Sequence, residues 1–146
     1  MREVGFSARG ERLDALLLRP EGARLLYVLA HGAGAGMRHA WLQRMAEALA
    51  GEGVATFRYQ FPYMQAGRKR IDPPEVLHAA VRAAVAAAHE AAPDLPLIAG
   101  GKSLGGRMTT CLADAPRPVP GLMIRHFLLR APWARPSRDR EFRVRE

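Results

Sequence analysis

Hydrophobic residues along this chain gather in short runs that alternate with longer stretches of helical periodicity. The short runs are rich in leucine, valine and aromatic residues, and charged or glycine-rich positions separate them, which is typical of strands. They cover residues 13–19, 25–30, 54–59, 95–99 and 121–129. Residues 2–8 alternate more weakly and predict a further strand at the edge of the sheet.

Three stretches between these runs place apolar residues on one face at helical spacing. They cover residues 38–50, 74–92 and 103–114. The middle stretch is the clearest, because Pro74 suits the first helical turn, Glu75 follows it and Pro93 stops the pattern. Strands that alternate with helices in this way predict an α/β fold, with a mainly parallel sheet and helices on both of its faces.

The sequence contains no internal repeat and no sign of a second domain. We expect one domain over residues 1–129 and an irregular basic tail over residues 130–146. The sheet is expected to end with the apolar run 121–129, which would leave an edge uncovered. An uncovered apolar edge favours self-association.

Length and composition describe one ordinary domain. The chain has 146 residues, a formal net charge of +8 and a single cysteine, Cys111. One cysteine excludes a disulfide framework and a cysteine-rich zinc site, and we expect neither a metal nor a cofactor. No run approaches the roughly 18 apolar residues of a membrane helix, and the N-terminus lacks an export signal. We therefore expect a cytoplasmic protein without a membrane partner.

The basic charge is concentrated at one end of the chain. Residues 116–146 carry eight arginines against three acidic residues, whereas the rest of the chain has a net charge of only +3. The main body therefore lacks the clustered basic surface of nucleic-acid-binding domains, and we do not expect a nucleic-acid partner for it. Contact with nucleic acid through the basic tail is a separate hypothesis.

A glycine-rich turn at residues 100–106 follows a predicted strand and opens a predicted helix. A phosphate-binding P-loop would need a glycine at the position of Pro96, so that motif fails. The pattern G-x-S-x-G does fit, with Ser103 between Gly101 and Gly105. A serine on a sharp strand-to-helix turn needs tiny residues two positions away on both sides, because those residues crowd its Cβ. The turn predicts a serine nucleophile, although a plain connecting loop would also use glycine.

A second glycine-rich turn, His31-Gly-Ala-Gly-Ala-Gly36, lies between an earlier predicted strand and helix. A dinucleotide-binding loop would need a glycine at the position of Met37, so that motif fails as well. What remains is a loop that brings a backbone N–H group next to the nucleophile. Donors at Ala33 and at Leu104, directly after Ser103, would form an oxyanion hole for acyl transfer.

Five residues of the two turns are expected to have structural roles. They are His31, Gly32, Gly34, Gly101 and Gly105. For the aromatic segment that follows residue 57, two interpretations stay open. Tyr59 and Tyr63 either pack in the core or line an acyl pocket.

Three stretches together resemble the α/β-hydrolase superfamily. They are residues 31–36, residues 57–64 (FRYQFPYM) and residues 99–108 (AGGKSLGGRM). More narrowly, the chain is similar to a dienelactone-hydrolase-like branch, which also includes the hydrolase-like domain of an animal histone-acetyltransferase complex subunit. The resemblance covers roughly residues 13–125. It implies a mainly parallel sheet, a nucleophile at Ser103 and oxyanion donors at Ala33 and Leu104.

One part of the family pattern is missing from this sequence. The family implies an acid and then a histidine on loops after two later strands, yet only 43 residues follow Ser103. The only histidine among them, His126, lies inside the apolar run 121–129, where we expect a strand. The resemblance therefore implies an α/β-hydrolase fold that is truncated at its C-terminus, lacks its last strands and lacks the acid and histidine of the triad.

These features predict a serine hydrolase that acts on small-molecule carboxylic esters or thioesters. A serine without a general base is a weak nucleophile, so we expect the activity of this chain to be impaired. The alternative is a binding or scaffold protein that keeps the hydrolase fold without catalysis.

Overall fold

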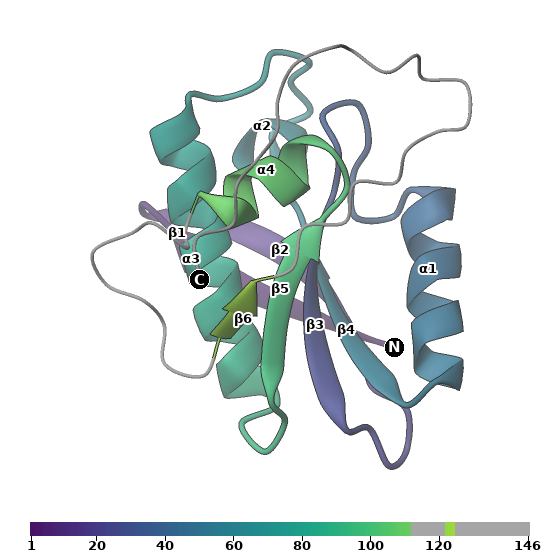
Figure 1. Ribbon diagram of the computed structural model, residues 1–146. Helices are drawn as coiled ribbons and strands as arrows, with labels where there is room; N and C mark the ends of the chain where they lie inside the picture. The colour runs from purple at the N-terminus through teal and green to yellow at the C-terminus, as the bar shows by residue number, and fades with distance from the viewer. Residues whose placement is uncertain (112–121, 125–146) are drawn as a thin grey trace, which may run out of the picture.

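The computed structural model describes residues 1–111 and 122–124 of the chain. Within them a six-stranded sheet has the order β1-β2-β4-β3-β5-β6 (Figure 1). The strands are β1 (Arg2–Ala8), β2 (Glu11–Leu18), β3 (Leu25–Ala30), β4 (Val54–Tyr59), β5 (Leu97–Gly101) and β6 (Leu122–Ile124). The β1–β2 and β2–β4 pairs are antiparallel, whereas β3–β4, β3–β5 and β5–β6 are parallel. The prediction of a mainly parallel sheet is confirmed.

Helices cover both faces of this sheet, as the sequence predicts. They are α1 (Ala40–Gly51), α2 (Pro62–Gln65), α3 (Pro74–Ala91) and α4 (Leu104–Thr110). α1 lies on one face, and α3 lies on the other (Figure 1). In the central strand β3, Leu26 and Val28 join the core under α3, while Tyr27 and Leu29 pack towards α1. Burial on both faces explains why the strand is hydrophobic at nearly every position.

α3 illustrates how the helix signals in the sequence act. Pro74 occupies the first helical turn with Glu75 beside it. The helix buries six residues spaced one, three or four apart along one face: Leu77, Ala80, Val81, Ala84, Val85 and Ala88. It ends at Ala91, one residue before the predicted end, because Ala92 precedes Pro93 and adopts a φ of −150°. A residue that precedes proline is disfavoured in the helical conformation.

β2 begins two residues earlier than predicted and α1 begins two residues later, and two further elements differ from the prediction. β5 lies two residues later than the predicted strand 95–99, because its two glycines pair with the end of β3 rather than forming part of the turn. The four-residue α2 lies in a stretch predicted as loop. Pro62 begins α2, and four residues are too short for a hydrophobic period to appear.

Parts of several predictions lie outside the described residues. These parts are residues 112–114 of the third predicted helix, residues 121 and 125–129 of the last predicted strand, and the predicted tail at 130–146. Within residues 1–111 and 122–124, no helix is long and apolar enough to cross a bilayer. The same part of the chain contains no group of three or more histidine, cysteine, aspartate or glutamate residues that could hold a metal ion.

Candidate active site

Ser103 lies in the turn between β5 and α4, in a backbone conformation that residues with a side chain seldom adopt. Its φ is 50° and its ψ is −110°. Among the non-glycine residues that the structure describes, only Arg9, in the turn between β1 and β2, also has a positive φ. Such a conformation costs on the order of 1–3 kcal/mol, so the surrounding structure must hold it in place. The residue itself is exposed, which leaves its hydroxyl accessible.

The glycines on both sides of Ser103 allow β5 and α4 to approach the end of β3. A Cβ built on Gly101 would lie 2.6 Å from the Ala30 carbonyl oxygen and 2.7 Å from the Ala30 Cβ. A Cβ on Gly105 would lie 2.6 Å from the Ala30 Cβ and 2.6 Å from the His31 carbonyl oxygen. Contacts this short would force the backbones apart, because no flexible side chain is available to give way. Both positions therefore require glycine.

The turn after β3 lies directly beside the serine. A Cβ on Gly32 would be 3.6 Å from the Lys102 carbonyl oxygen and 3.9 Å from the Ser103 Cβ. The Lys102 N–H group also donates to the Ala30 carbonyl at 3.0 Å. Gly34, in contrast, has no neighbour within 4 Å of an added Cβ, so its surroundings leave room for a side chain. The two glycine-rich turns thus meet at Gly32 and Ser103.

His31 is fully buried, and both of its ring nitrogens are used. Nε2 accepts a hydrogen bond from the Phe61 N–H group at 3.1 Å, and Nδ1 lies 2.8 Å from the Gly32 carbonyl oxygen. Since a carbonyl can only accept, Nδ1 carries the proton and donates it. Burial lowers the pKa of His31, so the ring is neutral at neutral pH. This histidine holds the turn and has no free nitrogen for proton transfer.

The hydrogen bond from His31 also orients the next amide group. In a trans peptide the carbonyl and the N–H group point in opposite directions. The Gly32 carbonyl points to the His31 ring, so the Ala33 N–H group of the same peptide points away from that ring. Within residues 1–111 and 122–124, neither the Ala33 nor the Leu104 N–H group donates a hydrogen bond.

Tyr63 and Tyr59 lie beneath this turn, and neither side chain is exposed. The Tyr63 hydroxyl donates to the Ala33 carbonyl oxygen at 2.8 Å. Tyr59 packs in the core, with its ring centroid 6.2 Å from that of Phe6 and 5.3 Å from that of Phe61. Tyr59 thus packs in the core, whereas Tyr63 supports the turn. A role for either residue in an acyl pocket stays a prediction.

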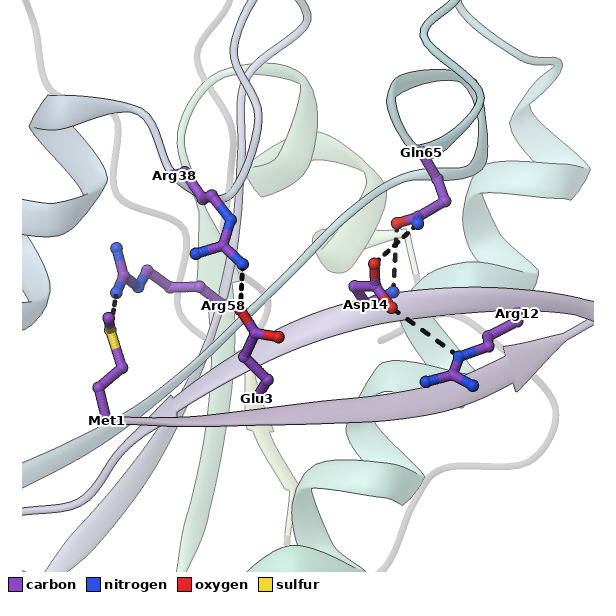
Figure 2. A network of polar contacts seen from close by, with 7 residues as sticks. All are labelled: Met1, Glu3, Arg12, Asp14, Arg38, Arg58 and Gln65. Atoms are coloured by element: carbon purple, nitrogen blue, oxygen red, sulfur yellow. Dashed lines mark hydrogen bonds and ion pairs between the residues drawn. The ribbon is translucent and has the colours of Figure 1, made fainter.

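Two side chains that the sequence analysis does not single out also contact the turn. Gln60 accepts the Met37 N–H group on Oε1 at 2.9 Å, and Arg58 donates from Nη1 to the Met37 carbonyl at 3.3 Å. Arg58 is fully buried, and its Nη2 lies 3.3 Å from the Met1 sulfur (Figure 2). Arg58 and Gln60 are polar residues inside an otherwise apolar segment, and this is the sequence signal that could have indicated such contacts.

Among the described residues, no histidine or carboxylate hydrogen-bonds to Ser103. His39 caps α1 by accepting the Trp41 N–H group at 3.1 Å. His78 and His89 lie on α3. His126 and the acidic residues that follow the serine lie outside the described residues: Asp114, Asp139, Glu141 and Glu146.

Comparison with known proteins connects this geometry to one family. A family described as "Alpha/beta hydrolase domain" matches residues 23–144. Solved structures with a similar fold include a dienelactone hydrolase from Anabaena variabilis, with 22% identity, a TM-score of 0.69 and coverage of 85% of this chain and 62% of that one. No curated protein matches the chain.

Two further structures have the same fold. An alpha-beta serine hydrolase homologue from Coxiella burnetii is 17% identical, with a TM-score of 0.66 and coverage of 79% of this chain and 58% of that one. A highly thermostable carboxyl esterase from Bacillus coagulans is 17% identical, with a TM-score of 0.68 and coverage of 84% and 43%. The chain spans less than two thirds of each of these three structures. At these identities the likeness concerns the fold.

Proposed function

The chain belongs to the alpha/beta hydrolase family, and from this premise we propose that Ser103 is the nucleophile of a hydrolase for small-molecule carboxylic esters or thioesters. The single observation that best supports the proposal is the positive φ of Ser103, at a turn that meets the loop after β3. A strained serine at the end of a parallel strand is the feature on which acyl transfer in this fold depends.

The proposed reaction follows from the groups around Ser103. Its Oγ attacks the carbonyl carbon while the hydroxyl proton passes to solvent water, and the oxyanion that forms accepts hydrogen bonds from the Ala33 and Leu104 N–H groups. Collapse of this intermediate expels the alcohol or thiol, which takes up a proton from water, and leaves an acyl group on Ser103. Water then releases the carboxylic acid and restores the serine. Each oxyanion donor of this kind contributes roughly 10²–10³-fold to the rate.

The proposal includes a slow reaction for this chain. Attack requires a base to take the proton from the Ser103 hydroxyl, and His31 has both ring nitrogens occupied. The other histidine of interest, His126, lies in the predicted strand 121–129. Catalysis without base assistance is slower by roughly 10²–10⁴-fold, so we expect turnover far below that of a complete serine hydrolase.

Labelling with a fluorophosphonate tests the proposal without requiring turnover, because the reagent traps an activated serine covalently. We expect the purified chain to form one adduct, located at Ser103 by peptide mass spectrometry. Ser103→Ala should abolish it, whereas Ser7→Ala, at an exposed serine of β1, should retain it. A folded wild-type chain that forms no adduct at Ser103 would contradict the proposal and favour a non-catalytic binding protein with the same fold.

A further inference from the structure

Four contacts join the turn after β3 to one later segment of the chain. We name residues 31–37 the oxyanion loop and residues 58–63 the clamp segment. The contacts are Tyr63 Oη to Ala33 O at 2.8 Å, Gln60 Oε1 to Met37 N at 2.9 Å, Arg58 Nη1 to Met37 O at 3.3 Å, and Phe61 N to His31 Nε2 at 3.1 Å. The clamp segment thus contacts both ends of the oxyanion loop.

We infer that Tyr63 is a positioning residue for the oxyanion hole, acting through Ala33 without touching the substrate. The inference rests on the proposed function, since it concerns the same site. His31 holds the carbonyl of the peptide that precedes Ala33, and Tyr63 holds the carbonyl of the peptide that follows it. With both flanking peptides fixed, the backbone angles of Ala33 are fixed, and so is the direction of its N–H group.

The Tyr63 side chain is itself held firmly enough to position another group. Its ring stacks on Phe61 with centroids 6.3 Å apart and planes at 15°, and it meets the His31 ring edge-on at 6.1 Å. The Tyr63 carbonyl accepts the Arg68 N–H group at 2.7 Å. Burial raises the pKa of Tyr63, so the hydroxyl keeps its proton at neutral and moderately alkaline pH and remains a donor.

The helix that carries Tyr63 is also attached to the sheet. Gln65 of α2 donates from Nε2 to Asp14 Oδ2 at 2.9 Å and accepts the Asp14 N–H group at 3.2 Å (Figure 2). Asp14 lies in β2, so the position of α2 depends on the sheet rather than on the loop. A donor held by the sheet can keep an amide within the few tenths of an ångström that oxyanion binding requires.

The chain offers a matched pair of variants for this inference. Tyr63→Phe removes one hydroxyl and keeps the stacked ring, so it removes the hydrogen bond to Ala33 and little else. Tyr59→Phe removes the hydroxyl of another fully buried tyrosine in the same stretch of chain, but this hydroxyl bonds no residue of the oxyanion loop. Both variants are expected to fold, and thermal melting checks this.

The experiment uses two readouts on the full chain. The first is the limiting rate of fluorophosphonate labelling at saturating reagent. The second is amide hydrogen exchange at Ala35, whose N–H group donates to the Gly32 carbonyl inside the loop at 3.2 Å. For Tyr63→Phe we expect labelling to slow by roughly five- to tenfold at an unchanged half-saturating concentration, and exchange at Ala35 to quicken by a similar factor. Tyr59→Phe keeps the apolar ring, the part of the side chain that an acyl pocket would use, so it should match the wild type in both.

The two readouts separate this inference from the proposed function. If the wild type is not labelled, the proposed function fails, and exchange alone decides whether Tyr63 fixes the loop. Faster exchange in Tyr63→Phe only would still support that role, whereas unchanged exchange would overturn it. Faster exchange without slower labelling would also overturn the inference, because the loop would then loosen with no effect on the site. Equal changes of labelling and exchange in Tyr63→Phe and Tyr59→Phe would also overturn the inference, because both changes would then reflect a general loss of stability.

Discussion

A Cβ placed on Gly105 would lie 2.6 Å from the Cβ of Ala30, so α4 packs against the end of β3 with only the Ala30 methyl group between them. We therefore expect Gly105→Ala to lower the free energy of unfolding by about 1–3 kcal/mol, the usual range for overpacking. Urea unfolding measures this change.

Gly34→Ala is the matched control, because no atom lies within 4 Å of its added Cβ. We expect this variant to differ from the wild type by less than about 1 kcal/mol. Equal unfolding midpoints for the two alanine variants would show that close contact with Ala30 does not restrict position 105.

The backbone strain at Ser103 predicts that this residue lowers the free energy of unfolding. Ser103→Gly should raise the free energy of unfolding by about 1 kcal/mol, because glycine adopts a positive φ readily. Ser103→Ala also removes the hydroxyl but keeps a Cβ, so it should gain no such stability. Thermal denaturation of the three proteins checks the order. A glycine variant less stable than the alanine variant would mean that the turn is not strained in solution.

Because the His31 ring is buried and neutral, we expect the free energy of unfolding to fall in mild acid. Burial lowers its pKa in the folded state, so the unfolded chain binds the proton more tightly. The stabilisation from the neutral ring is therefore complete above the unfolded pKa of about 6.5 and is lost as the pH falls below it. The loss reaches at most about 1.4 kcal/mol per pH unit.

Chemical denaturation between pH 5 and pH 8 measures this slope. His31→Gln should flatten it, whereas His89→Gln, at an exposed position on α3, should not. A wild type and a His31→Gln variant with the same pH dependence would assign the titration to other groups.

Gln60 is expected to hold the far end of the oxyanion loop. Gln60→Leu removes the acceptor of the Met37 N–H group and should cost about 1–2 kcal/mol, with faster amide exchange at Met37. Gln60→Glu keeps an oxygen acceptor at the same place and should retain slow exchange. If the leucine variant exchanges as slowly as the wild type, the Met37 amide is protected by something other than Gln60.

The nucleophile turn is the part of the site that the sequence predicts best, and the reason is local. Gly101, Ser103 and Gly105 lie within five positions, between a strand and a helix, so a short pattern contains the geometric requirement. The same holds for α3, whose proline start and apolar face are both local signals. The catalytic role of Ser103 stays a proposal.

The support of the oxyanion loop could not be predicted in this way. Tyr63 and Ala33 are 30 positions apart, and they meet only because β3 and β4 are neighbours in the sheet. A hydrophobic pattern places both tyrosines near the core but does not tell which hydroxyl meets the loop. The same limit applies to β5, where pairing with β3 outweighs the low strand propensity of its glycines.

The size of Ala30, the last residue of β3, limits how closely the neighbouring segments can pack. The Ala30 Cβ lies against Gly101 and Gly105, so a single methyl group separates the end of β3 from the two glycines that flank Ser103. A bulkier residue at position 30 would move Ser103 away from Ala33 even if both were unchanged. If the proposed function is correct, the side chain at position 30, one residue upstream of the oxyanion loop, thus sets the width of the space that receives the carbonyl oxygen.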